Sequence, residues 1–449
     1  LSSLLQNLPV AGGDTIYIDT GVYPVASTNA FVLDDRNMGT TLKPLRIYGS
    51  TNLLLGGTLL LGDGTANGIR LQNTRHIELN DIRIAQAQNG ISIANVDTVR
   101  MRGMEIFNNQ NNGVIVSSSS STDLQNCLIH QNNQYGYHTV GHQGSQFIRS
   151  STIYGNRGGA VRNDMGVLIV SNSIIGGTNS TIIYTEGAAG TMGGDYNLFW
   201  MPEDGFIATN QNKMIMYSTL RQWQTGERDA HSFRVDPLFA DPDNGNYHLK
   251  SCAGWWDNGT WSVSDQTSWA IDAGDPASTA YSSEPSPHGG RLNLGAYGGT
   301  PFASKSDSSA MELLPVTLSD GGVAPPLQDL YWLYRGLSST NRVRLEYSRD
   351  NGATWLLVVD HHPIGSTPYA WFSDADPTPE ALWRVVLEAN TNIMGTTEVP
   401  FIHRTRDLIY YVNDGDRDGD IYTDAVGSPG NKGYEPDSPL DSIQAVLER

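Results

Sequence analysis

Glycines recur between residues 67 and 177 at an almost constant spacing, and this spacing restricts the folds open to the chain more than any other feature. They stand 22, 23, 23 and 23 residues apart, at Gly68, Gly90, Gly113, Gly136 and Gly159. An interval of this length is typical of one coil of a parallel β-solenoid, in which each coil pairs with the next. The spacing predicts turns at these glycines and solenoid coils between them.

The residues that follow each glycine alternate in type. One apolar column comprises Ile69, Ile91, Val114, Tyr137 and Ala160, and a second comprises Leu71, Ile93, Val116 and Thr139. Between these columns lie Arg70, Ser92, Ile115 and His138. Successive side chains of a strand point to opposite faces, so we expect the two apolar columns in the core and the third at the surface. Cys127 aligns with Ile82 and Met104 and is expected in the core.

Asparagines occupy matching offsets between coils. Asn109 corresponds to Asn132, and Asn133 corresponds to Asn156. Side-chain amides both donate and accept hydrogen bonds, so stacked asparagines can bond from one coil to the next. We predict two such pairs at the turns of the solenoid.

Three phrases rich in Gly, Asp and Pro close the first part of the chain: DPLFADPDNGNYHLK (236–250), SWAIDAGDP (268–276) and RLNLGAYGGTP (291–301). Together with the preceding coils, they resemble the C-terminal part of right-handed parallel β-helix proteins of large secreted bacterial multidomain proteins. The resemblance covers about residues 10–305 and implies that fold, an extracellular setting and association with polysaccharide. Activity does not follow from a fold.

Aromatic, alternating strands distinguish the next part, whose hairpin signal is Asp350-Asn351-Gly352. This part resembles an immunoglobulin or fibronectin III-like module. The expected architecture is therefore all-β: a right-handed parallel β-helix (1–305), a small β-sandwich (306–404), and a cap segment that opens the next β-helix module (405–449). The expected role of the sandwich is spacing; carbohydrate binding through Trp332, Trp355, Trp371 or Trp383 is the alternative to a core role for these side chains.

The final segment holds the best metal candidate. Its alternating acids match the first positions of a calcium-binding loop, with Gly419 at the tight bend: Asp414, Asp416, Asp418 and Asp420. The twelfth position, where a bidentate acid belongs, is Ala425, and Asp424 stands one residue earlier. Ca²⁺ is the expected cofactor, and an acidic, solvated turn is the alternative.

The two ends of the chain read as parts of one helix. Joined tail to head, apolar residues recur every three or four positions: Leu440, Ile443, Leu447, Leu1, Leu4 or Leu5, and Leu8. Ser438 and Pro439 supply a start signal and Pro9 a stop. The prediction is that the sequence is one period of a tandem array, joined to further copies of itself through this shared helix.

Charge and composition narrow the partners. The chain carries 28 Lys and Arg against 47 Asp and Glu, a formal net charge of −19. Such a surface repels nucleic acid and anionic lipid. No apolar run approaches the ~20 residues of a membrane span. We therefore expect neither nucleic acid nor a membrane span, and an extracellular or cell-surface location.

Candidates for catalysis are few. Cleavage of polysaccharide by elimination requires a base, and His138 and His142, near Arg162 and Arg149, are the clustered candidates. Hydrolysis requires paired carboxylates, and Asp81, Asp97, Asp123 and Asp164 stand at different offsets. The leading hypothesis is therefore a structural repeat unit of an extracellular filament. The alternatives are a cell-surface adhesin that binds polysaccharide, and a polysaccharide lyase or glycoside hydrolase that acts in a β-helix groove.

Overall fold

The computed structural model describes residue 5 and residues 8–141, 144–177, 181–186, 190–202, 205–212, 214–224, 228–373, 375–404 and 409–447. The chain forms two compact units. One comprises Leu1–Met311 with Arg335–Leu337, and the other comprises Glu312–Tyr334 with Ser338–Arg449. Each is described separately, and the three-segment division expected from the sequence stays a prediction.

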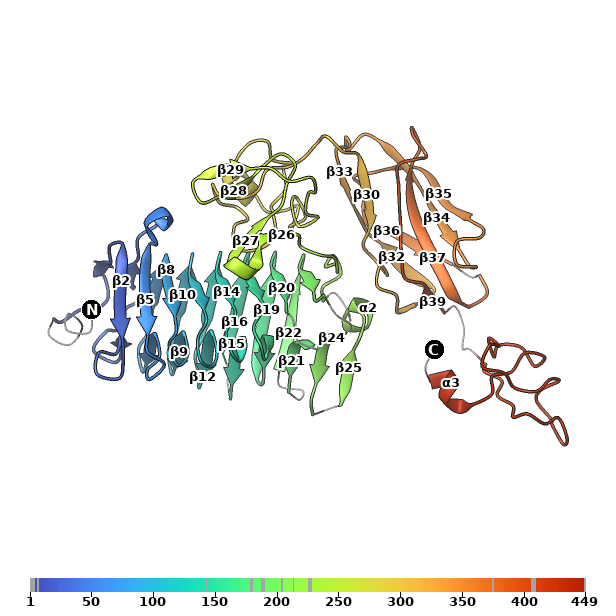
Figure 1. Ribbon diagram of the computed structural model, residues 1–449, viewed down its shortest axis with the longest axis horizontal. Helices are drawn as coiled ribbons and strands as arrows, with labels where there is room; N and C mark the ends of the chain where they lie inside the picture. The colour runs from blue at the N-terminus through green and yellow to red at the C-terminus, as the bar shows by residue number, and fades with distance from the viewer. Residues whose placement is uncertain are drawn as a thin grey trace. The chain divides into compact units, whose positions relative to one another are not determined.

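The first unit is a right-handed β-solenoid built from three parallel sheets (Figure 1). In the described part, sheet A contains β1 (Thr15–Tyr17), β4 (Leu45–Tyr48), β7 (Ile77–Asn80), β10 (Val99–Arg102), β13 (Thr122–Gln125), β16 (Ser145–Arg149), β19 (Gly166–Ser171) and β22 (Gly190–Asp195). Sheet B contains β2 (Gly21–Val25), β5 (Thr58–Gly62), β8 (Ile82–Ala85), β11 (Glu105–Phe107), β14 (Leu128–His130), β17 (Thr152–Tyr154), β20 (Ile174–Gly176) and β23 (Leu198–Trp200). Sheet C contains β3 (Val32–Leu33), β6 (Ile69–Gln72), β9 (Ile91–Ala94), β12 (Val114–Ser117), β15 (Tyr135–Val140), β18 (Gly159–Asn163), β21 (Thr181–Thr185), β24 (Phe206–Asn210) and an antiparallel edge strand, β25 (Ile215–Tyr217).

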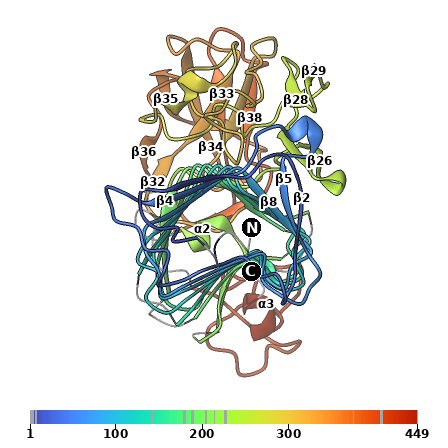
Figure 2. The same cartoon turned by 90° about the vertical axis from the view of Figure 1, so that its left-hand side faces the viewer.

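The predicted fold class is confirmed: the protein is all-β, with a right-handed solenoid followed by smaller antiparallel sheets. Figure 2 looks along the solenoid and shows successive coils superimposed in the three sheets. The side chains predicted to point inward are buried. In the first column, successive coils pair in register at Ile69, Ile91, Val114 and Tyr137. The fifth position differs, because Tyr137 pairs with Val161 rather than with Ala160. The fifth coil is thus shifted by one residue against the sequence alignment.

Four of the five recurring glycines are required by close packing rather than by turn geometry, and the fifth, Gly159, has a φ of 127°, which favours glycine. A Cβ atom on Gly113 would lie 2.5 Å from Cγ2 of Ile129 and 2.6 Å from the carbonyl oxygen of Gly136. Gly68, Gly90 and Gly136 meet an isoleucine of sheet B in the same way, at 2.2–2.3 Å. Many turns are instead made by asparagine in the left-handed region, for which this residue is the best suited after glycine. Examples are Asn73, Asn95, Asn108, Asn126 and Asn172.

An asparagine ladder crosses three coils inside the solenoid. The side chains of Asn109 and Asn132 are fully buried, and the Nδ2 atom of Asn109 donates to Oδ1 of Asn132 at 2.8 Å. Nδ2 of Asn132 donates in turn to Oδ1 of Asn156, also at 2.8 Å. The predicted pair of Asn109 with Asn132 is confirmed. The partner of Asn156 is Asn132, not Asn133, because the longer coil moves Asn156 into the same column.

Apolar side chains close both ends of the solenoid core. At the N-terminal end, Leu5 is helical and, with Val10, belongs to the buried core. At the other end, α2 (Leu220–Trp223) places Leu220 and Trp223 in the same core, and Figure 2 shows this helix across the coils. Thr219 and Gln222 form a capping box at the start of α2. The open ends of the sheets are thereby covered.

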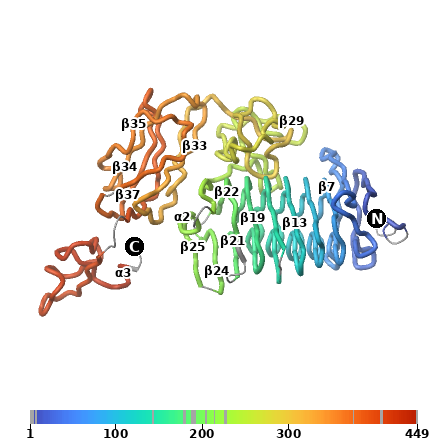
Figure 3. The backbone as a smooth tube through the Cα atoms, turned by 180° about the vertical axis from the view of Figure 1, so that it is seen from behind, coloured from blue at the N-terminus to red at the C-terminus, as the bar shows by residue number. Residues whose placement is uncertain are grey.

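A long excursion, residues 238–305, leaves the last coil and returns to pack on sheet B (Figures 1 and 3). It contains β26 (Phe239–Asp241), η2 (Pro242–Asn244), β27 (Asn246–Leu249), the hairpin β28 (Trp255–Asp257) and β29 (Thr260–Ser262), and η3 (Ala280–Ser283). Asn126 holds its far end, because its Nδ2 atom donates to the carbonyl oxygens of Ala296 at 3.0 Å and Gly298 at 2.7 Å. The backbone N–H of Ala296 donates to Oγ1 of Thr152 at 3.0 Å.

The second unit is built from antiparallel strands and one parallel pair. Its strands are β30 (Glu312–Pro315), β31 (Val323–Ala324), β32 (Leu327–Leu330), β33 (Trp332–Arg335), β34 (Arg342–Ser348), β35 (Leu356–Pro363), β36 (Tyr369–Phe372), β37 (Thr378–Leu387), β38 (Met394–Thr396) and β39 (Phe401–His403). The hairpin predicted at Asp350-Asn351-Gly352 is confirmed between β34 and β35. Trp332 and Trp383 are fully buried and Trp371 is 5% exposed, so these three tryptophans form core. Trp355 lies beneath the guanidinium of Arg384, at 4.0 Å from its ring centroid.

The C-terminal segment differs from the single helix expected from the sequence. Helix α3 spans Ile443–Leu447 and begins three residues after Leu440. Leu440 is fully buried in a bridge to Val412, and its backbone bonds to Tyr411 and Asn413. The bond from Asn413 uses the carbonyl oxygen that a helix starting at Leu440 would need. In α3, Oγ of Ser442 instead accepts the N–H of Ala445. Leu1 and Leu4 lie outside the described residues, Leu8 and Ile443 are exposed, and the head-to-tail helix stays a prediction.

Candidate functional site

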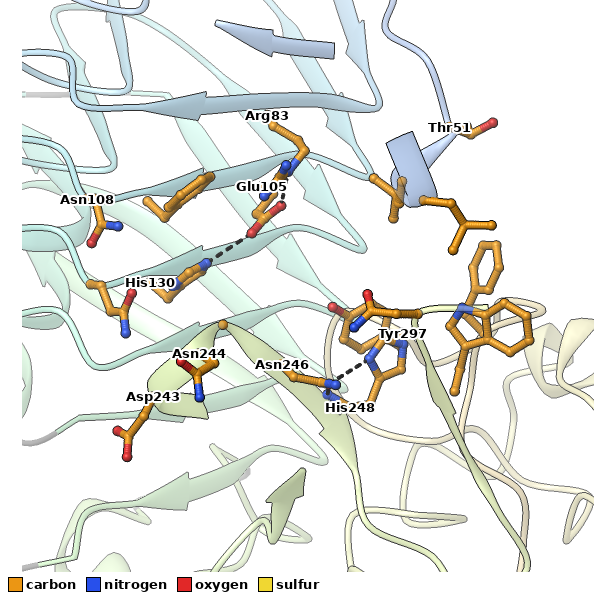
Figure 4. A pocket seen from close by; sticks show the side chains of 18 of the residues that line it. Thr51, Arg83, Glu105, Asn108, His130, Asp243, Asn244, Asn246, His248 and Tyr297 are labelled. Atoms are coloured by element: carbon orange, nitrogen blue, oxygen red, sulfur yellow. Dashed lines mark hydrogen bonds and ion pairs between the residues drawn. The ribbon is translucent and has the colours of Figure 1, made fainter. Parts of the chain in front are cut away.

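A groove of about 680 Å³ lies between the outer face of sheet B and the excursion (Figure 4). Its coil wall comes from β8, β11 and β14, and the opposite wall comes from residues 243–248, 256–258 and 297–302. The loop around η1 (Leu53–Leu55) borders one end through Thr51, Asn52, Leu53 and Leu54. The volume lies within the range of about 300–1,000 Å³ common for ligand sites.

Three side chains on successive coils form a linked row in the coil wall. Nε of Arg83 donates to Oε2 of Glu105 at 2.5 Å, and Nε2 of His130 lies 3.3 Å from Oε1 of the same carboxylate. The row follows from register, since Glu105 pairs with Arg83 and Phe107 pairs with His130. The rings of Phe107 and His130 are stacked, with centroids 5.2 Å apart. Figure 4 shows both polar contacts converging on Glu105.

The charge of Glu105 is fixed by its partners. Burial acts to raise the pKa of this carboxyl group, but hydrogen bonds from His130 and Arg83 outweigh it and hold the pKa below its ordinary value. Arg83 is held as well, because Nη1 donates to the carbonyl oxygen of Gly56 at 3.1 Å. Glu105 is thus an ionised hydrogen-bond acceptor at neutral pH, and its charge offsets that of Arg83.

His248 forms the opposite wall with Tyr297. The two rings are stacked, with centroids 3.6 Å apart and planes 15° from parallel. Nδ1 of His248 lies 3.0 Å from Oδ1 of Asn246, and the same oxygen accepts the backbone N–H of His248 at 3.2 Å. Nε2 is buried and has no hydrogen-bond partner among the described residues. Burial lowers the pKa of His248 to about 3, so the ring is neutral at pH 7.

The remaining lining combines aromatic faces with amides. Trp256 packs edge-on against Trp261, at 5.4 Å, and lies 5.7 Å from the ring of Phe302. The side-chain amides along the groove are those of Asn52, Asn108, Gln131, Asn244, Asn246 and Asn258. Aromatic rings provide flat apolar contact, and amides both donate and accept hydrogen bonds. Among the described lining residues, the acidic and basic side chains other than histidine are Arg83, Glu105 and Asp243.

The catalytic candidates that the structure describes lie outside this groove. His138 is on β15 of sheet C, where its Nε2 atom is 3.1 Å from Oδ2 of Asp164. Nε of Arg162 donates to Oδ1 of the same aspartate at 2.7 Å. Arg149 belongs to sheet A and pairs with Asp123, so it does not join them. His142 lies outside the described residues.

The calcium loop shows turn hydrogen bonds within itself. Oδ1 of Asp414 accepts the N–H of Asp416, and Oδ1 of Asp416 accepts the N–H of Asp418. Oδ2 of Asp420 accepts from Asn413 at 2.6 Å. Within the ranges that the structure describes, no three His, Cys, Asp or Glu side chains, Asp424 included, are grouped as metal ligands. Calcium at this loop stays a prediction.

Sequence reasoning missed the groove although part of its signal was present. Glu105 and His130 stand at outward positions of the coils, and Asn246 and His248 lie within one of the closing phrases. The separation of these residues along the chain hid their proximity. Only the return of the excursion onto sheet B brings them together.

A comparison with protein families agrees with the solenoid. The family model described as "Right handed beta helix region" matches residues 67–219. No curated protein matches the chain. Similar solved structures include an alginate lyase from Paenibacillus sp. str. FPU-7, which is 13% identical with a TM-score of 0.38. The alignment covers 52% of this chain and 90% of the lyase. The pectate lyase Pel9A is 13% identical with a TM-score of 0.35, and the alignment covers 66% of this chain and 90% of that one. Likeness at this level carries no conclusion about activity.

Among the described helices, none has the length and apolar character to cross a membrane.

Proposed function

We propose that the solenoid unit binds a polysaccharide in the groove between sheet B and the excursion. The observation that carries the proposal is the lining, which combines the aromatic side chains of Trp256, Phe302 and Tyr297 with side-chain amides. Sugar rings present apolar faces and many hydroxyl groups, and both kinds of group have partners here. An extracellular or cell-surface location, where such polymers are found, is part of the proposal.

The charges favour binding over hydrolysis. Hydrolysis of a glycosidic bond requires a carboxylic acid that donates a proton, usually with a raised pKa, and a second carboxylate. Glu105 is held in the ionised form by Arg83 and His130, so it is a poor proton donor. The proposed role is therefore that of a polysaccharide-binding surface protein, and turnover by lysis or hydrolysis is the rival outcome of the test.

The test compares Trp256→Ala with the wild-type chain in affinity electrophoresis through gels that contain soluble polysaccharides. We expect about a tenfold loss of affinity, since removal of one aromatic face costs roughly 1–1.5 kcal/mol. The matched control is Tyr17→Ala, which removes a 79% exposed aromatic ring on sheet A, outside the groove. Equal retardation of wild type and Trp256→Ala by every polymer would contradict the proposal.

A second measurement separates binding from turnover. Each retained polymer is incubated with the protein and assayed for new reducing ends and for the ultraviolet absorbance of unsaturated sugars. We expect neither product. Products that disappear in Glu105→Gln would establish cleavage in the groove in place of binding alone.

A further inference from the structure

We infer that the groove accepts an uncharged polysaccharide and excludes polyuronates. This inference rests on the proposed function and names the ligand class of the same site. It is carried by three features of the lining: the balance of its charges, the predominance of amides among its polar side chains, and the uncharged ring of His248.

The charges leave no cation for a uronate. Arg83 is the lining residue with a permanent positive charge among those described, and Glu105 and Asp243 carry two negative charges. The guanidinium of Arg83 already bonds to Glu105 and to the carbonyl oxygen of Gly56. A uronate carboxylate in the groove would lose water and gain no unpaired partner of opposite charge, which is unfavourable. The chain's net charge of −19 adds long-range repulsion of any polyanion.

The amides suit hydroxyl groups. Six of the polar lining residues are Asn or Gln, and an amide group has two N–H donors and an oxygen acceptor. Part of this capacity is used within the protein, because the amides of Asn244, Asn258 and Gln131 donate to Asp241, Asp257 and Pro242. A sugar hydroxyl likewise both donates and accepts. The groove can therefore bond to a neutral sugar in several orientations without leaving a charge unpaired.

His248 closes the same wall without adding a charge. Oδ1 of Asn246 accepts from the backbone N–H of His248, so the Nδ1 atom beside the same oxygen carries the proton of the ring. The neutral ring is buried, and its stack on Tyr297 fixes its orientation. This ring therefore gives a uronate carboxylate no positive charge to pair with.

The experiment measures retardation of the full chain by neutral polymers (xyloglucan, galactomannan, hydroxyethyl cellulose) and by polyuronates (polygalacturonate, alginate). Each gel is run at low and high ionic strength, once with a chelator and once with added Ca²⁺. We expect at least one neutral polymer to bind with little dependence on salt, and no polyuronate to bind under any condition. Tighter binding of a polyuronate, with or without Ca²⁺, would overturn the inference while leaving polysaccharide binding intact. Failure of every polymer of both classes would remove the proposed function itself.

A variant tests the charges directly. In Asp243→Asn and in Glu105→Gln with Asp243→Asn, the ratio of polyuronate affinity to neutral-polymer affinity at low salt is expected to rise at least tenfold. Asp265→Asn, which changes the same charge at an exposed position outside the groove, should leave the ratio unchanged. An unchanged ratio in the single and double variants, with the fold verified by circular dichroism, would show that these carboxylates do not set the ligand class.

Discussion

At the scale of single residues, His248 supports the proposed site by orienting Tyr297. Its ring is held by Asn246 and stacks on Tyr297, and its Nε2 atom is buried. His248→Ala removes the stack, and we expect affinity for the neutral polymer to fall about three- to tenfold, the value of one aromatic pair of ~0.5–1.5 kcal/mol. His248→Phe keeps the stack and should change the affinity by less than about threefold. The measurement is titration of the retained polymer, with exposed His288→Ala as the control.

The buried ring of His403 is expected to make the stability of the second unit depend on pH. Burial, with Arg349 nearby, lowers the pKa of His403 to about 4, and its Nδ1 atom lies 2.7 Å from the Tyr347 hydroxyl oxygen. Below pH ~6.5 the unfolded chain takes up a proton that the folded chain resists until pH reaches about 4. Stability is therefore lost as pH falls through this window, by on the order of 3 kcal/mol. Urea unfolding at pH 7 and pH 4 should show a smaller loss in His403→Gln than in wild type; equal losses would exclude this cause.

Some residue roles could be predicted from sequence and others could not. Cys127 was expected in the core and is fully buried, and burial raises the pKa of its thiol to about 12. The polar partners of His138 were not predictable, because Asp164 follows a loop whose length changes the register of the next coil. His130 was overlooked for a related reason: its partner Glu105 lies one coil away at a non-equivalent offset.

At the scale of elements, the spacing of the glycines predicted the coils correctly. The glycines were expected to make turns, but most of them are required by close packing between coils. They allow sheet C to approach the isoleucines of sheet B, as Gly113 does Ile129. The coils and the inward columns repeat at a regular spacing along the sequence, so they could be predicted from it. The groove could not, because it depends on where an excursion of about 70 residues returns.

Gly113→Ala tests this packing. The added methyl group would lie within 2.6 Å of both Ile129 and a backbone oxygen, so the coils must move apart. We expect a loss of at least ~1–3 kcal/mol in the free energy of unfolding of the solenoid, as for other overpacked cores. In Gly193→Ala the nearest atom is the flexible end of Ile169, at 3.2 Å, and the loss should be smaller. Urea unfolding followed by circular dichroism measures both, and equal effects would argue against close packing as the reason for the glycine.

At the scale of the whole molecule, the two units have separate cores. The solenoid buries columns such as that of Ile106, and the second unit buries Val385 with Trp332 and Trp383. Units with their own cores unfold separately unless a large interface couples them. Calorimetry should therefore resolve two transitions, with Ile106→Ala lowering one midpoint and Val385→Ala lowering the other. A single transition shifted by both variants would show that the units unfold together.

The attachment of the excursion also bears on how the protein is made. Asn126 can bond to Ala296 only after Ala296 has been synthesised, and 170 residues separate the two along the chain. At translation rates of ~5–20 residues per second, the ribosome needs on the order of 10–30 s to supply that distance. During this interval the coils can already stack on one another, while the outer face of sheet B lacks the excursion, and Tyr154 is not yet covered by Phe239 and Tyr247. The nascent protein is thus expected to form its scaffold early and the groove of the proposed site late, and a chain that ends before this return would lack one wall of the groove.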